Sequence, residues 1–161
     1  MNKASNLIIS ALVLAFGLVP EHTGAQNASD ASPQRVLHEG THRMKININI
    51  GGKTLTATLA DNATALVFAS VLPLTVSMSD LFGREKYADS PRALSEAGPR
   101  ENRYEIGEIA YWSPARQFAV YYHQDGKSIP SPGIIPIAKI DAGTEAFEVS
   151  GSVKVDIELD K

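Results

Sequence analysis

Apolar and polar residues alternate along several short stretches between residues 44 and 159, and this period of two predicts half-buried strands. In the first stretch, Ile46, Ile48 and Ile50 are separated by polar residues. Gly51-Gly52 follows, a pair that tolerates the positive φ angles of a tight hairpin turn. Alternation resumes over residues 54–59, so the first two strands are predicted to form a hairpin. The same pattern predicts further strands over residues 74–79, 134–140 and 153–159.

The alternation is interrupted by one helical stretch and two polar stretches. Asp61 or Asn62 can cap a helix over residues 63–72, which Pro73 would end. Residues 80–103 are polar and contain glycine and proline, which predicts a long loop with a helical turn near residues 90–96. Loops of that length tend to be functional. A second loop is predicted over residues 124–133.

Residues 104–122 concentrate the aromatic side chains of the chain: four Tyr, the only Trp and a Phe. Ser113-Pro114 predicts a turn in the middle, because proline presets φ and serine can bond within its own turn. Alternation places about half of these aromatic side chains in a core. With seven or eight short strands and one helix, the chain is predicted to be mainly β: a small closed antiparallel barrel with one or two short helices.

The N-terminal 25 residues have the character of an export signal. Lys3 precedes an uncharged apolar run over residues 7–19, Pro20 ends that run, and small residues lead to a cleavage site after Ala25. We expect a signal peptide over residues 1–25, a flexible linker over 26–43 and one domain over 44–161. The mature protein is then expected in a bacterial periplasm or outside the cell, without stable membrane insertion. A retained anchor is the alternative.

Composition excludes several classes of function. The formal net charge is −3, and the basic residues are dispersed, so no nucleic-acid partner is expected. The chain has no cysteine, which excludes disulfides, thiol nucleophiles and cysteine-ligated metals. Residues 38–42 read HEGTH, but Gly40 disfavours the helix that a zinc site of this pattern requires. We therefore predict no metal and no cofactor. The only histidine of the predicted domain is His123.

Six residues are candidates for ligand contact. Arg84, Glu85, Lys86 and Tyr87 cluster charges with an aromatic ring inside the long predicted loop. Arginine and lysine can hold a carboxylate or carbonyl oxygen, and Glu85 can orient them or accept an N–H from the ligand. Trp112 and Tyr122 are predicted to line a pocket. The alternative is a loop stabilised by its own ion pairs, with Tyr87 packed on the barrel.

The sequence also resembles the bacterial cyclophilin-like proteins. Three blocks carry the resemblance: LPLT, MSDL and GREKY within residues 72–87, GEIAYWSP with FAVYY within 107–122, and IPSPG with IAKI within 129–140. The family usually has Asp where this chain has Glu108. The resemblance spans residues 44–159 and implies a cyclophilin-like β-barrel.

The prolyl isomerase signature of eukaryotic-type cyclophilins is absent. It consists of Arg, then Phe after four residues, then Gln after two more. Arg116 is separated from Phe118 by one residue, and Asp89 follows Arg84 by five. We therefore expect an exported barrel of uncharacterised activity that binds a small molecule or peptide in a cleft near residues 84–87. The alternative is a divergent peptidyl-prolyl cis-trans isomerase with a relocated arginine. No catalytic residue is assigned.

Overall fold

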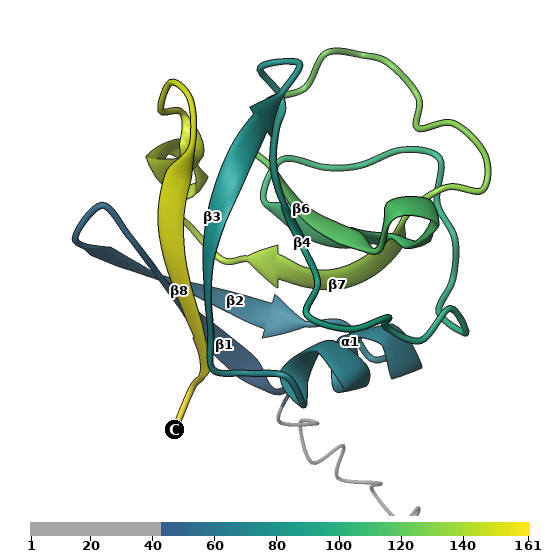
Figure 1. Cartoon of the computed structure of the whole chain (residues 1–161), viewed down its shortest axis with the longest axis horizontal. Coiled ribbons are helices and arrows are strands. Elements are labelled where there is room, and N and C mark those ends of the chain that lie inside the picture. Colours follow the sequence, from purple (N-terminus) through teal and green to yellow (C-terminus); the bar gives the residue numbers. More distant parts are fainter. Residues whose placement is uncertain (1–42) are drawn as a thin grey trace, which may run out of the picture. The chain divides into compact units, whose positions relative to one another are not determined.

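A computed structural model describes residues 43–161, which form a closed antiparallel barrel of eight strands with one α-helix (Figure 1). The predicted signal peptide, all of the predicted linker except Arg43, and the HEGTH motif lie outside the described residues. The mainly β barrel predicted from the sequence is confirmed.

The elements follow one another along the chain with short connections in the first half and longer ones in the second. They are β1 (Lys45–Ile50), β2 (Lys53–Leu59), α1 (Ala63–Ala69), β3 (Leu74–Leu81), β4 (Glu85–Asp89), β5 (Glu108–Trp112), β6 (Gln117–Tyr121), β7 (Ile135–Ile140) and β8 (Val153–Leu159), with 3₁₀ turns at Ser113–Ala115 and Thr144–Phe147. Around the barrel the order is β1-β2-β7-β5-β6-β4-β3-β8, which leaves no open edge.

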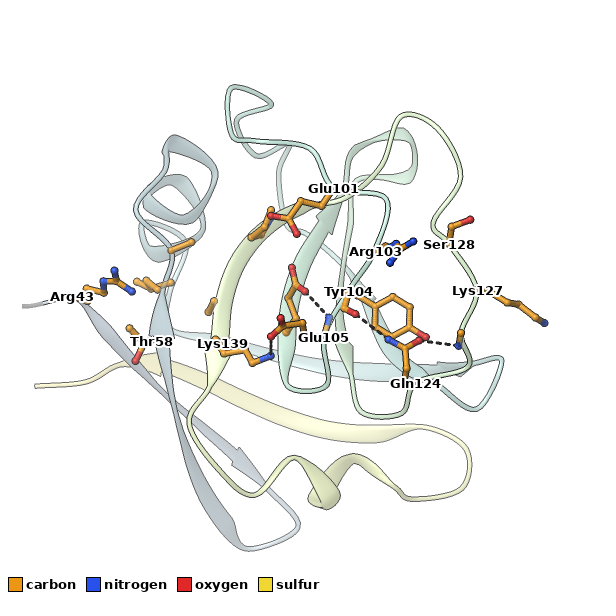
Figure 2. A pocket seen from close by; sticks show the side chains of 16 residues that line it. Arg43, Thr58, Glu101, Arg103, Tyr104, Glu105, Gln124, Lys127, Ser128 and Lys139 are labelled. Atoms are coloured by element: carbon orange, nitrogen blue, oxygen red, sulfur yellow. Dashed lines mark hydrogen bonds and ion pairs between the residues drawn. The ribbon is translucent and has the colours of Figure 1, made fainter.

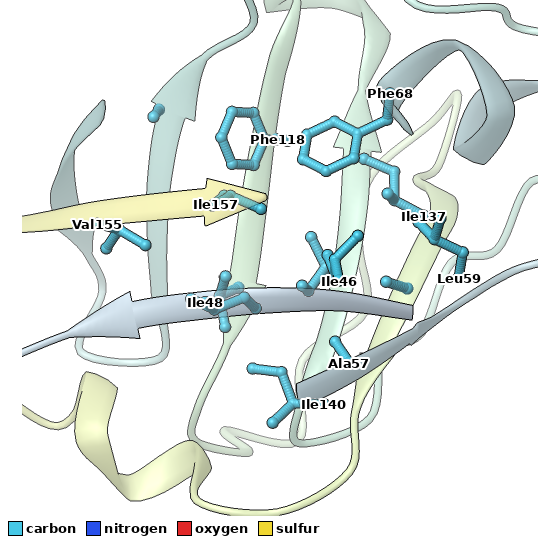
Figure 3. Close-up of a cluster of buried hydrophobic side chains, with 14 of the residues drawn as sticks. Ile46, Ile48, Ala57, Leu59, Phe68, Phe118, Ile137, Ile140, Val155 and Ile157 are labelled. Carbon is cyan, nitrogen blue, oxygen red and sulfur yellow. The ribbon is translucent and has the colours of Figure 1, made fainter. Parts of the chain in front are cut away.

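Strand alternation builds the barrel interior as predicted. Ile46, Ile48 and Ile50 of β1 are buried, and Figure 3 shows Ile46 and Ile48 in the cluster that β2, β7 and β8 also supply. Phe68 of α1 meets Phe118 of β6 edge to face, with ring centroids 5.2 Å apart. Helix and sheet therefore share one core.

A second, smaller cluster lies on the outer face of β5 and β6. Strand residues Ala110, Ala119 and Tyr121 point outward there, and loop residues Tyr104, Ile129 and Ile134 cover them. The rings of Tyr104 and Tyr121 stack with centroids 4.2 Å apart. The loops before β5 and before β7 are thus packed on the barrel rather than free of it.

The helix begins as predicted and ends earlier. Asn62 is its N-cap, and the Asn62 side chain accepts a hydrogen bond from the Ala65 amide at 2.9 Å. The helix ends at Ala69 rather than residue 72. The amides of Val71 and Leu72 bond carbonyls three residues back, and Leu72 precedes a proline, which disfavours helical backbone.

Residues 80–103 are not one loop, so that prediction is wrong in its first half. β3 continues to Leu81, a tight turn follows at Phe82-Gly83, and Glu85–Asp89 forms β4. β4 pairs with β3 and β6, which provide partners for its backbone hydrogen bonds. The polar sequence of β4 does not by itself predict this pairing. Residues 90–96 contain no helical turn. Within residues 43–161, no helix has the length and apolar character needed to cross a membrane.

Candidate functional site

The predicted cluster at residues 84–87 is divided between the two faces of β4. Lys86 pairs in register with Val120, whose side chain lies in the core, so Lys86 points into the barrel. Glu85 and Tyr87 pair with Tyr121 and Ala119, which belong to the outer cluster. The six candidate residues therefore do not form one site.

Lys86 closes one end of the barrel from the inside. Its side chain is fully buried, and its Nζ donates to Asp80 Oδ2 at 2.9 Å and to the carbonyl oxygens of Val149 and Gly151. The Tyr122 hydroxyl donates to the same Asp80 oxygen at 2.6 Å. These bonds lower the pKa of Asp80, chiefly through Lys86, while burial and the bond to Asp80 raise the pKa of Tyr122 to about 12.

Arg84 is the centre of a separate network on the outside of the barrel. Its Nε lies 3.3 Å from Glu85 Oε2, and its Nη1 lies 3.2 Å from Asp125 Oδ2. The guanidinium also faces the rings of Phe82 and Tyr104, at 5.3 and 5.5 Å from the centroids. Arg84 and Glu85 are 7% and 6% exposed, so their charges are largely committed to these partners.

Tyr87 and Trp112, also predicted as ligand contacts, lie half-buried against the outer cluster. Tyr122, the sixth predicted contact, is 8% exposed and belongs to the barrel core. Whether any of the six contacts a ligand stays a prediction.

A large cleft lies elsewhere, over the outer face of β7. Its volume is about 980 Å³, within the range of ligand sites. Figure 2 shows Thr58 on one side, Glu101 and Glu105 in the middle, and Tyr104, Gln124 and Ser128 on the other side. Ala138 and Pro136 of β7 and Leu59 of β2 also line it. The cleft thus combines a few apolar side chains with several polar ones.

Glu108 is the most deeply placed charge in this cleft. It is 8% exposed, and one carboxylate oxygen accepts the Glu105 amide at 2.9 Å. Burial raises the pKa of Glu108, and the nearby charge of Glu101 adds to the rise. The closest cation that lines the cleft, Lys139, is bonded to Glu105 at 2.8 Å. The inner part of the cleft therefore favours a hydrogen-bond donor or a cation.

Charges of both signs lie in the exposed part of the cleft, where Glu101 and Glu105 are accompanied by basic side chains. Arg43, Arg103 and Lys127 are exposed and line it (Figure 2). A second hollow of about 650 Å³ shares Glu101 and Arg103 with the cleft and continues past Ile129 to Pro132. The two together offer an elongated surface. Across the described part of the chain, no three His, Asp or Glu side chains gather as metal ligands would.

Sequence reasoning missed the residues that shape this cleft. Glu108 was noticed only as a departure from the family pattern, although a carboxylate opening the apolar run IAYW is a signal for a buried charge. Asp125-Gly126 was recognised only as part of a loop. Glu101 and Tyr104 reach the cleft through loop folding, for which periodicity offers no signal.

Comparison with known proteins agrees with this architecture. A model of the cyclophilin-like family matches residues 48–158. A search of curated proteins finds no match. The solution structure of the hypothetical protein AF2241 from Archaeoglobus fulgidus is similar, with a TM-score of 0.57 and 21% identity over 72% of this chain and 94% of that one. That likeness shows the fold alone. The family match spans most of the barrel, and the chain belongs to the cyclophilin-like family.

Proposed function

We propose that this protein is a binding module that holds a peptide segment, through a positively charged or N–H-rich group, in the cleft over β7. The observation that carries the proposal is the buried carboxyl of Glu108, which lines a cleft of about 980 Å³. Hydrogen bonds between a charged acceptor and a donor are stronger than neutral ones, so an ammonium group would be held most firmly there.

The surroundings of Glu108 support a peptide more than a compact metabolite. The adjoining hollow extends the cleft along Ile129 to Pro132, which suits an extended chain. The exposed basic residues Arg103 and Lys127 can donate hydrogen bonds to carbonyl or carboxylate oxygens, while Glu101 and Glu108 can accept from the cation. A ligand with both kinds of group matches both signs of charge in the cleft.

Calorimetric titration of the full chain with the tripeptides Gly-Lys-Gly and Gly-Glu-Gly, both with blocked termini so that only the lysine peptide carries an ammonium group, tests this function. We expect saturable binding of the lysine peptide and binding at least about tenfold weaker for the glutamate peptide, since one charge-assisted hydrogen bond contributes about 1.5 kcal/mol or more. Glu108→Gln should weaken the lysine peptide about tenfold. Glu158→Gln, an exposed change on β8, is the matched control. Equal binding of both peptides, or none, contradicts the proposal.

The isomerase alternative receives less support from the geometry. It requires a guanidinium that can approach a substrate proline, and Arg84 is 7% exposed with bonds to Glu85 and Asp125. A proline-isomerisation assay on a model Xaa-Pro peptide, with Arg84→Ala as control, decides between the two. Catalysis that Arg84→Ala abolishes would replace the binding proposal with the enzymatic one.

We also propose that the protein is exported, on the strength of the apolar run at residues 7–19 and the small residues before Ala25. Fractionation of the native host followed by mass analysis of the N-terminus is the test. A mature chain that begins at Gln26 outside the cytoplasm is the expected result, and an intact Met1 in the cytoplasm contradicts it.

A further inference from the structure

One wall of the cleft is a short segment of the connection between β6 and β7. This strap, residues 123–128, contributes four of the cleft-lining residues: Gln124, Gly126, Lys127 and Ser128. It contains no helix or strand of its own. Its position therefore depends on the side chains and turns that tie it down.

Both ends of the strap are fixed by backbone bonds. At its start, the Tyr122 and His123 amides donate to the Arg84 carbonyl at 2.9 and 3.2 Å. Just beyond its end, the Ile129 amide donates to the Asn102 carbonyl at 2.8 Å. Between these points, the strap is free to stand nearer to or farther from the cleft unless something holds its middle.

Asp125 is what holds the middle. Its Oδ1 accepts the Tyr104 hydroxyl and the Lys127 amide, both at 2.9 Å, and its Oδ2 accepts Arg84 Nη1 at 3.2 Å. The Asp125 amide donates to the Tyr104 hydroxyl at 3.2 Å. Figure 2 shows Tyr104 beside Gln124, whose side chain also donates to the Tyr104 carbonyl. Asp125 and Arg84 themselves do not line the cleft.

Arg84 connects Asp125 to the barrel. It lies immediately before β4, is nearly buried, and stacks between Phe82 and Tyr104. Tyr104 in turn stacks on Tyr121 of β6 and lines the cleft. A rigid strand is thereby connected to a cleft wall through one ion pair and one tyrosine.

We propose that Arg84 and Asp125 are positioning residues for the ligand cleft: their ion pair holds the strap where its side chains and backbone can contact a bound peptide. The claim rests on the proposed function, since it assigns these residues to the same site. Loss of the pair lets the strap move without unfolding the barrel. Binding should then weaken, because a pre-organised wall reduces the ordering cost of binding. The two residues act on the ligand through the strap and not by contact.

Amide hydrogen exchange on the full chain, followed residue by residue by NMR, tests the first half of the proposal. Asp125→Asn keeps the size of the side chain and removes its charge. We expect the Ile129 amide, which Asp125 does not bond, to exchange at least about tenfold faster through local opening, while the amides of Ala119 and Val120 in β6 keep their rates. Asp89→Asn is the control, because Asp89 likewise accepts a side-chain hydrogen bond, from Gln117 on β6, but is exposed. Arg84→Lys, which keeps the charge and loses the forked geometry, should give a smaller acceleration in the same direction.

Titration of the same variants with Gly-Lys-Gly tests the second half. We expect Asp125→Asn to weaken binding about fivefold and Asp89→Asn to leave it unchanged. The proposal is overturned if Ile129 exchange does not change, if β6 amides accelerate in parallel as general destabilisation would cause, or if the strap opens and the affinity is retained. If the unaltered chain binds neither tripeptide, the proposed function fails and the positioning role fails with it. That outcome is distinguishable because the exchange result stands by itself.

Discussion

Lys86 and Arg84 are two residues apart in the sequence, yet Lys86 points into the barrel and Arg84 lies on its outside. Lys86 is wholly inside, and its ammonium joins β3 to the loop before β8 through one carboxylate and two backbone carbonyls. Arg84 is outside. Its guanidinium bonds the carboxylate of Glu85 in β4 and that of Asp125 in the strap, and so ties the two segments together. The inner network thus ties strands together inside the barrel, whereas the outer one ties the strap to β4, where we propose that a ligand binds.

The largest effect is expected from Lys86→Met. The change leaves the carbonyls of Val149 and Gly151 without their lysine donor, and it leaves Asp80 with only the Tyr122 hydroxyl and the Gly83 amide. The free energy of unfolding should therefore fall by about 3 to 5 kcal/mol. Urea denaturation measures it. Lys154→Met, on the exposed side of β8, is the control and should change little. A loss below about 1 kcal/mol would show that the inner network does not stabilise the barrel end.

Arg84→Met should cost less, about 2 kcal/mol, because the Glu85 carboxyl can take up a proton when its partner is lost. Burial already raises the pKa of Glu85. Adding Glu85→Gln to the variant should therefore recover part of the loss, whereas adding Asp80→Asn to Lys86→Met should not, since the two carbonyls remain unpaired. Denaturation of the single and double variants measures this contrast. Equal recovery in both pairs would remove the distinction between the networks.

Glu108→Gln should raise stability slightly, by less than Arg84→Met lowers it, and only at neutral pH. Burial raises the folded-state pKa of Glu108, so ionising it costs stability as the pH rises from the unfolded pKa through the folded one. Below the unfolded pKa, about 4.3, the carboxyl is protonated in both states and the replacement changes little. Thermal denaturation at pH 4 and pH 7 tests the sign. A variant that is less stable than the natural chain at pH 7 contradicts it.

The smallest effect is expected from Phe82→Asn at the β3–β4 turn. Phe82 has φ of 57° and is 75% exposed, a conformation that asparagine adopts more readily. Relief of that strain is offset by loss of the contact with Arg84, which contributes about 0.5 to 1 kcal/mol at an exposed position. Chemical denaturation should detect a net change below about 1 kcal/mol. A larger loss would mean that Phe82 supports the Arg84 network more than its exposure indicates.

The inner half of this comparison was largely predictable from the sequence and the outer half was not. Alternation placed about half of the aromatic side chains of residues 104–122 in a core, where Tyr111, Phe118 and Tyr122 lie, and it predicted the β1–β2 hairpin and the closed barrel. It failed at β4, because EKYAD carries no apolar period and is held as a strand by β3 and β6. Core-facing side chains recur at every second residue of a strand, so the alternation of apolar and polar residues in the sequence predicts them.

The candidate site depended on contacts that no local pattern encodes. Tyr104 belongs to no strand, and it packs over the outer face of β6 from the segment before β5. Asp125 meets Arg84 across 41 residues of sequence. Such long-range pairs are determined by how loops fold back on the barrel, and their polar side chains have no period to read. Arg84 and Glu85 were singled out by residue type, yet their partners could be identified only in three dimensions.

The cleft over β7, with the buried Glu108 carboxyl in its wall, is the ligand site that we propose. Amide chemical-shift mapping of the full chain during titration with Gly-Lys-Gly tests it most directly. We expect saturable shifts for Glu105, Glu108, Gly126 and Lys139, weakened in Glu108→Gln, with the amides of β8 unmoved. Saturable shifts centred on the opposite side of the barrel, or no saturable shift at all, would contradict it.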